Sequence, residues 1–352
     1  MVEPDVSMAI IDRTVDAVCC CESRQSAAGK RSVIIGTPIK YRGQRNTGLG
    51  LPHMSHSIGV VIPLHNKRAH VRRAVESVLR QTHPDFKLTV VDDGSTDASA
   101  ECVGQIGDPR LSLIRTECHG PGAARNLGIR ATEADWIGLL DADDEWHPAF
   151  LEKTVTVARR VPHVVAVFTG IQLLDSAAPC PRTAGGLIDD YHDARLRFGV
   201  AMTSSSVLLH KAAFVSIGGF REDHRYAEDI EAWFRLACQG TSYYIAEALS
   251  RIEVNDPGST TRSVDSVERA AGLQMLLDSY EAYRRGGRIP PGQQRSCRVF
   301  MQEQRARLAL HLFAAGRRAA GARVLLTGVP FGPRTWREYV DCALLAFRHR
   351  RN

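Results

Sequence analysis

The sequence predicts an α/β fold in which parallel strands are joined by crossover helices, and two features of the chain support this prediction. From Ile58 onward, short runs rich in β-branched residues alternate with segments whose apolar residues recur at helical spacing. Several of the strand-like runs end in turn-forming or acidic residues. Short strands separated by helical patterns are typical of a parallel sheet with helices on its faces.

The expected elements follow one another from Ile58 to the fourth strand. The first strand is the run IGVVIP, which ends at Pro63. A helix that stops before Pro84 is predicted next by apolar residues at helical spacing, namely Val71, Ala74, Val75, Val78 and Leu79. Three further strands are expected in the runs KLTVVDD, LSLIR and ADWIGLL.

Carboxylates gather where two of these strands end. Asp92 and Asp93 close the second strand, and Asp141 and Asp143 follow the fourth in the stretch LLDADDEW. Ligands of such sheets bind at the carboxyl ends of the strands, so we expect one shared site. Carboxylates one residue apart suit a hard divalent cation such as Mg²⁺ or Mn²⁺. The alternative interpretation is a polar loop that caps the helix beginning near Pro148.

Two other segments are candidates for the same site. In GPGAARNLGI, the glycines let the backbone approach a ligand, and Arg125 and Asn126 open a helix whose N-terminus can hold an anion. In YAEDIEAWFRLA, Glu228 and Asp229 lie in the first turn of a helix, where one of them can act as a general base. Each segment also has a structural interpretation: a turn followed by a surface arginine, and acidic side chains placed favourably at a helix dipole.

Taken together, the segments resemble glycosyltransferase family 2, a large family of inverting enzymes that use nucleotide-sugar donors. The resemblance rests on six motifs in order: VVIPLHN, VVDDGSTD, GPGAARNLGI, LLDADDEW, TSSSVLLHKAAFVSIGGF and AEDIEAWFRLA. It implies a GT-A fold over residues 56–262, which is a Rossmann-like mixed sheet flanked by helices.

The resemblance also implies which residues hold the nucleotide. Pro63, Leu64 and Asp93 are expected to bracket the nucleobase and its sugar, with Asp93 accepting a hydrogen bond from the base. Asp92 belongs to the same acidic turn, and a structural role for it stays open. Arg125 resembles the family's arginine near the nucleotide pocket.

For the chemistry, Asp141 and Asp143 match the family's DxD motif. The resemblance implies that Asp143 binds Mn²⁺ or Mg²⁺ directly and that Asp141 lies closer to the ribose or to metal-bound water. The metal would offset the charge that grows on the leaving nucleoside diphosphate. Asp229 corresponds to the catalytic base, which takes the proton of the acceptor hydroxyl in one inverting displacement, while Glu228 supports the site or orients the acceptor.

Two further segments are matched less closely. SIGGF resembles the turn near the family's acceptor site, so Gly218 and Gly219 are expected to contact a sugar through their backbone, although a plain turn explains them nearly as well. Where many relatives carry a histidine after the last strand, this chain has Asn255 and Asp256. We expect Asn255 to be the third metal ligand, with Asp256 as the alternative. Ser259–Thr261 resembles the segment that closes over the diphosphate.

The ends of the chain differ from its centre. Residues 1–55 show no sustained periodicity, and we expect little fixed structure there; we hypothesise that translation naturally starts at Met54. Residues 263–352 hold 16 arginines, no lysine and seven acidic residues, a net charge of +9 in a chain of +6. They predict a basic helical C-terminal extension, which is either a solvated face or a surface for an anionic membrane.

Composition limits the class of protein. The hydrophobic content of 44% is ordinary for a soluble globular chain, and no run approaches the ~18 apolar residues of a membrane span. The nine cysteines include no CxxC pair, which favours reduced thiols in a cytosolic protein. We therefore expect a cytoplasmic protein, with peripheral contact at the inner face of the cell membrane as a further hypothesis and no nucleic-acid partner.

The predicted function is inverting transfer of a sugar, UDP-linked by analogy with most of the family, to a hydroxyl of a glycan or lipid-linked acceptor in cell-envelope polysaccharide biosynthesis. Two alternatives stay open. A sugar-phosphate nucleotidyltransferase would share the fold and the metal but release pyrophosphate. A non-catalytic nucleotide-sugar binding module would retain Asp93 and Asp143 without turnover.

Overall fold

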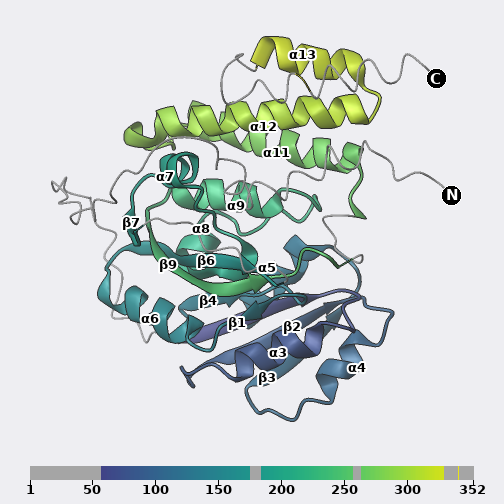
Figure 1. Cartoon of the computed structure of the whole chain (residues 1–352), viewed down its shortest axis with the longest axis vertical. Coiled ribbons are helices and arrows are strands. Elements are labelled where there is room, and N and C mark those ends of the chain that lie inside the picture. Colours follow the sequence, from purple (N-terminus) through teal and green to yellow (C-terminus); the bar gives the residue numbers. More distant parts are fainter. Residues whose placement is uncertain (1–56, 175–183, 257–262, 329–339, 341–352) are drawn as a thin grey trace, which may run out of the picture.

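The computed structural model describes residues 57–174, 184–256, 263–328 and Val340. In these residues a mixed sheet is covered by helices on both faces, and a layer of longer helices lies beyond one of them (Figure 1). The predictions for residues 1–55, for the start at Met54 and for Ser259–Thr261 fall outside the described residues. The same holds for the predicted extension after residue 328, apart from Val340, which is helical.

The sheet has the strand order β3-β2-β1-β4-β8-β6-β9-β5, and β7 pairs with β9. The bounds of the strands are β1 Ile58–Leu64, β2 Lys87–Asp93, β3 Leu111–Thr116, β4 Trp136–Leu139, β5 Glu145–Trp146, β6 Val164–Leu173, β7 Gly186–Ile188, β8 Val207–His210 and β9 Thr241–Ile252. Strands β1 to β4 are parallel, as their sequence pattern predicts. Strand β8 runs antiparallel to β4 and β6, which makes the sheet mixed.

Successive residues of β1 face opposite hydrophobic clusters, as the alternation of a strand requires. Val60 and Ile62 pack into the cluster under α3 (Val71–Leu79) and α6 (Phe150–Arg160). Val61 packs into the other cluster, under α5 (Pro121–Ala131), α7 (Tyr191–Phe198), α8 (Lys211–Ser216) and α9 (Glu228–Ala237). The short α4 (Ser99–Gly104) lies next to β2 and β3. Because β1 is buried on both faces, its carboxyl end is held rigidly.

Helix α5 lies close against β1 and β2 because it has a glycine at the contact. A Cβ on Gly128 would come 2.3 Å from Cγ1 of Val61, which is too close for any side chain. The helix begins at Pro121, after Gly120 with a φ of 99°. Arg125 is therefore the fifth residue of α5, and the prediction that it opens the helix is wrong by one turn.

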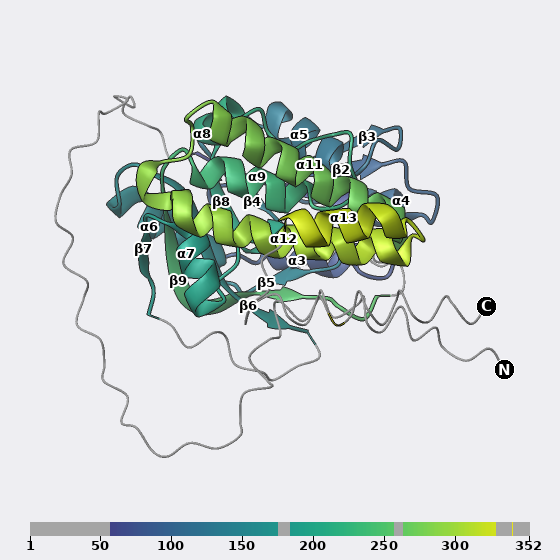
Figure 2. The ribbon, with the colours of Figure 1, turned by 90° about the horizontal axis from the view of Figure 1, so that it is seen from above.

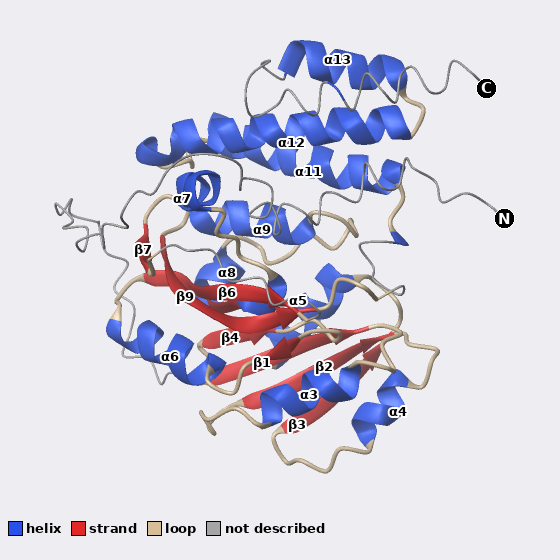
Figure 3. Cartoon of the chain, in the orientation of Figure 1, coloured by secondary structure: helices blue, strands red, loops and turns tan. Residues whose placement is uncertain are grey.

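The C-terminal helices are α11 (Ser266–Arg285), α12 (Gln294–Ala314) and α13 (Arg318–Gly328). Helix α11 packs on α9 and on α12, and α13 packs on α12 as the outermost helix (Figures 1 and 2). Phe234 of α9 shares a hydrophobic cluster with Leu276 of α11 and Phe300 of α12. In Figure 3 the described part of this region consists of helices joined by short loops. The extension thus packs on the helix that carries Glu228 and Asp229. In the described part of the chain, no helix has the length and apolar character needed to span a membrane.

Candidate active site

The acidic turn after β4 is braced by a buried serine. The hydroxyl of Ser205 accepts a hydrogen bond from the backbone N–H of Asp141 at 3.0 Å and donates one to the carboxylate of Asp144. Asp144 is buried, and it also accepts the backbone N–H of Glu253 at 2.8 Å. Burial, followed by the charges of Asp143 and Asp141, raises the pKa of Asp144 well above its usual range. Asp144 therefore shapes the turn, and Asp141 and Asp143 are left to face a ligand.

The backbone carbonyl of Ser205 is held as well. It accepts hydrogen bonds from the indole of Trp146 and from the hydroxyl of Ser250, both at 2.7 Å. Ser205 thereby joins the acidic turn to β5 and β9, which are far apart in sequence. The motif TSSSVLLH contains this residue, but its hydroxyl pattern alone gives no sign of the turn that it supports.

Arg125 lies between the acidic turn and the first turn of α9. Its guanidinium donates to Asp141 at 2.8 Å and to Glu228 at 3.0 Å, and only 7% of its side chain is exposed. Burial opposes the charged form, but the carboxylates of Asp141 and Glu228 outweigh this effect and keep the pKa of Arg125 above its usual range. Arg125 is thus a charged bridge between two of the predicted motifs.

Glu228 and Asp229 occupy the first turn of α9, as predicted, and differ in exposure. Glu228 is buried, and burial together with the charge of Asp229 raises its pKa to about 7, against the opposite influence of Arg125. Asp229 is half-buried. Loss of contact with water raises the pKa of Asp229, whereas the positive charge of Arg125 acts to lower it.

Helix α9 is fixed on its far side by a second buried acid. Glu231 has no exposed surface, and it accepts hydrogen bonds from Arg235 at 2.6 Å and from Ser279 of α11 at 2.5 Å. The C-terminal extension therefore contributes directly to the position of Asp229, a contribution that the sequence pattern of the extension does not reveal.

Asp143 is paired with a lysine. Its carboxylate lies 2.7 Å from Nζ of Lys67, in the loop after β1, and the same ammonium contacts Asp256 after β9. Asn255 is exposed, and its backbone N–H donates to Glu253 at 2.7 Å. Its predicted role as a metal ligand stays a prediction, and the neighbouring Asp256 is the residue that reaches the pair.

The donor set suits a hard divalent cation. The carboxylate of Asp143 already holds a positive group, and Asp141 is one-third exposed on the same turn. Carboxylate oxygens are the ligands that Mg²⁺ and Mn²⁺ prefer, and both ions accept phosphate oxygens as further ligands. Within the described ranges, no cluster of three or more histidine, cysteine or acidic side chains has metal-binding geometry. Binding of a divalent cation by Asp141 and Asp143 therefore stays a prediction.

The acidic turn after β2 is buried and engaged with backbone. Asp92 accepts the N–H of Ser95 at 3.1 Å, whereas Asp93 accepts those of His119 at 2.9 Å and Gly120 at 2.8 Å. The parallel strands β1 and β2 end side by side, because Pro63 pairs with Val91 and Leu64 with Asp92. Asp93 thus holds the loop that leads into α5, and its remaining lone pairs are what it can offer to a nucleobase.

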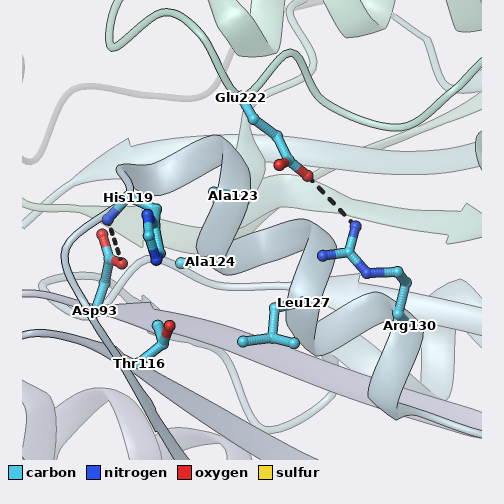
Figure 4. Close-up of a pocket in the computed structure, with 8 residues that line it drawn as sticks. All are labelled: Asp93, Thr116, His119, Ala123, Ala124, Leu127, Arg130 and Glu222. Carbon is cyan, nitrogen blue, oxygen red and sulfur yellow. Dashed lines mark hydrogen bonds and ion pairs between the residues drawn. The ribbon is translucent and has the colours of Figure 1, made fainter.

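A cavity of about 410 Å³ adjoins Asp93. Figure 4 shows Asp93 and His119 at one end and the ion pair of Arg130 with Glu222 at the other. The cavity is lined by Asp93, Thr116, His119, Ala123, Ala124, Leu127, Arg130 and Glu222. Of the predicted nucleotide residues, Asp93 is the one that lines this cavity.

The glycine turn after α8 has a local structural reason. Gly218 and Gly219 have φ values of 93° and 69°, which side chains rarely adopt. A Cβ on Gly219 would come 2.6 Å from Oδ1 of Asn126, which accepts the N–H of Phe220 at 2.9 Å. The turn thus packs on α5 next to Arg125, and acceptor binding by these glycines stays a prediction.

Comparisons with known proteins identify the domain. Residues 59–183 match the family model described as glycosyl transferase family 2. An uncharacterized glycosyltransferase of Rickettsia typhi is 24% identical over 225 residues, which cover 61% of this chain and 70% of that protein. Residues 59–183 carry a family 2 glycosyltransferase domain. The succinoglycan biosynthesis protein ExoO of Rhizobium meliloti is 39% identical over 108 residues, 30% of this chain and 31% of that protein.

Solved structures confirm the GT-A fold of this glycosyltransferase. Residues 1–349 of S. aureus TarS in complex with UDP-GlcNAc superpose with a TM-score of 0.58 at 13% identity, covering 84% of this chain and 92% of that one. The mannosyltransferase PcManGT from Pyrobaculum calidifontis, in complex with GDP-Man and Mn²⁺, gives 0.54 at 20% identity, covering 84% and 82%. The predictions of family, fold and enzyme class are therefore confirmed.

Proposed function

We propose that this glycosyltransferase moves a sugar from a nucleoside-diphosphate sugar, UDP-linked, to a hydroxyl of a glycan or lipid-linked acceptor, with inversion and with Asp229 as the base. The observation that carries the proposal is the bridge of Arg125 between Asp141 and Glu228. It places the turn expected to hold the donor diphosphate beside the helix turn that carries Asp229.

The donor side of the site would be formed by Asp141, Asp143 and the loop held by Asp93. Asp143 and Asp141 would hold Mn²⁺ or Mg²⁺, which supplies positive charge against the diphosphate when it is bound. The Mn²⁺ and GDP-Man of PcManGT and the UDP-GlcNAc of TarS support a metal and a nucleotide sugar here. Because these two structures hold different nucleotides, both UDP and GDP are needed to test the choice of donor.

The acceptor side would be formed by Asp229. Its carboxylate takes the proton of the acceptor hydroxyl while the acceptor oxygen bonds to the anomeric carbon. The bond from that carbon to the diphosphate oxygen breaks, and its electron pair leaves with the nucleoside diphosphate. A single displacement of this kind inverts the anomeric configuration. The buried Arg125 stabilises the ionised form of Asp229, because its charge lowers the pKa of that carboxyl.

Binding of nucleotides tests the donor side. Calorimetric titration with UDP and with GDP, each with Mn²⁺ and with a chelator, should show metal-dependent binding of one nucleotide. Asp143→Ala should weaken that binding, and Asp223→Ala, which removes an exposed carboxylate, should leave it unchanged. A folded protein that binds neither nucleotide would contradict the proposal.

Products distinguish the alternatives. Incubation with nucleotide sugars and candidate acceptors should release a nucleoside diphosphate. Pyrophosphate released from a sugar phosphate and a nucleoside triphosphate would instead identify a nucleotidyltransferase. Donor binding without any turnover would indicate a binding module. The similarity to ExoO supports polysaccharide assembly as the setting in which acceptors are sought.

A further inference from the structure

Two carboxylates from distant parts of the chain converge on one lysine. Asp143 follows β4 and Asp256 follows β9, yet both contact Nζ of Lys67, Asp143 at 2.7 Å. The exposed fractions of the three side chains are 8% for Lys67, 16% for Asp143 and 10% for Asp256. An ammonium with so little exposure is tolerated only when acids surround it, since an unpaired buried charge is costly.

The backbone of Lys67 is fixed, so this convergence is built into the fold. The N–H of Lys67 donates to the hydroxyl of Ser99 at 2.9 Å, and its carbonyl accepts the N–H groups of His70 and Val71, both at 2.9 Å. The loop is therefore anchored to α4 and to the start of α3. His70 also lies 3.7 Å from the second oxygen of Asp256. The ammonium is thus held in one place, between the two carboxylates.

We propose that Lys67 is an internal counter-ion which occupies Asp143 and Asp256 in the free protein, and that the divalent cation of the donor has to displace it. This inference rests on the proposed function, and it assigns Asp256, not Asn255, to the cation site. An ammonium and a divalent cation compete for the same carboxylate oxygens, and they repel each other at close range. The lysine therefore lowers the affinity for metal alone and disfavours a metal-loaded site without the diphosphate.

The proposal makes an unusual prediction, because removal of a site residue should strengthen metal binding. Titration of Mn²⁺ followed by electron paramagnetic resonance measures metal affinity without any activity. Lys67→Met should bind Mn²⁺ at least about tenfold more tightly than the wild type, whereas Asp256→Asn should bind it more weakly. Lys153→Met is the matched control, since Lys153 forms an exposed pair with Glu247. The Mn²⁺ affinity of this variant should equal that of the wild type.

A second measurement, the melting temperature with and without Mn²⁺, tests the proposal even if Lys67→Met is less stable than the wild type. If Lys67→Met is destabilised by repulsion between Asp143 and Asp256, Mn²⁺ should raise its melting temperature more than that of the wild type, because the ion binds the folded form. An equal or smaller rise, or an unchanged or weaker Mn²⁺ affinity, would overturn the proposal. If the wild type still binds a nucleotide with Mn²⁺ in that case, the inference about Lys67 fails while the proposed function stands. A wild type that binds no Mn²⁺, with or without nucleotide, refutes both.

Discussion

Arg125→Met tests whether the bridge between the two motifs is as important as its geometry indicates. The change leaves the buried carboxylate of Glu228 without its cation, and Asp141 loses a partner at 2.8 Å. Removing one partner of a buried ion pair costs about 3–5 kcal/mol of the free energy of unfolding. Asp141 adds little to this loss, because it is one-third exposed and water can replace the guanidinium. We therefore expect a loss of about 3–5 kcal/mol.

Urea unfolding monitored by circular dichroism measures this loss, and the chain offers a matched control. Arg130 lies on the same helix and pairs with Glu222 at 3.3 Å, but 62% of its side chain is exposed. Arg130→Met should cost no more than about 1 kcal/mol, as is usual for exposed pairs. The double variant Arg125→Met with Glu228→Gln should recover most of the lost stability, because no unpaired charge remains buried. An Arg125→Met protein as stable as Arg130→Met would refute this reasoning.

Three further predictions concern other parts of the molecule. Ser205→Ala should lower the free energy of unfolding by about 2–4 kcal/mol, because it leaves one oxygen of the Asp144 carboxylate and the N–H of Asp141 each without a partner; the exposed Ser216→Ala should show no comparable loss in the same urea assay. Glu228 has a folded pKa of about 7 against an ordinary value of 4.5, so its contribution to stability is full below pH 4.5 and is lost as the pH rises through about 7. The difference between the two pKa values corresponds to about 3 kcal/mol. Urea unfolding of the wild type should therefore give a lower free energy of unfolding at pH 8 than at pH 5, and Glu228→Gln should abolish this part of the pH dependence. A variant with the same pH dependence as the wild type would contradict a buried, proton-binding Glu228. The exposed arginines of the C-terminal extension should make the protein sediment with anionic liposomes at low salt but not with neutral ones. Failure to sediment with anionic liposomes would contradict the membrane hypothesis. The exposed arginines include Arg284, Arg285, Arg288, Arg295, Arg298, Arg317 and Arg323.

Much of the fold could be predicted from local patterns in the sequence. Strand β1 is an apolar run closed by Pro63, and Gly120 with Pro121 marks the start of α5. Such signals depend on neighbouring residues, so they can be recognised in one sequence. The antiparallel position of β8 between β4 and β6 cannot be recognised in this way, because strand order is decided by packing across the whole sheet. The family resemblance implies a mixed sheet but does not say which strand is reversed.

The candidate site divides in the same way. The acids Asp141, Asp143, Glu228 and Asp229 are visible in the sequence because they fall at a strand end and in a first helical turn within motifs that resemble those of the family. Arg125 is also visible in its motif, but its contacts with Asp141 and Glu228 are not, and neither is the role of Lys67. Lys67 looks like an ordinary loop lysine until the fold brings β1, β4 and β9 together at their ends. Ser205, Ser279 and Asp256 gain their roles in the same way, from contacts between residues far apart in the chain.

The role of Asp229 can be tested most directly by comparing turnover and donor binding in Asp229→Asn. The isosteric change keeps the shape of the first turn of α9 but removes the base. With the donor identified by calorimetry and present at saturation, release of nucleoside diphosphate should fall by about 10²–10⁴-fold, the usual contribution of a general base. Donor affinity should stay within about threefold of the wild type, since the metal ligands are untouched. Turnover that survives the change, in a variant that binds the donor normally, would contradict the account.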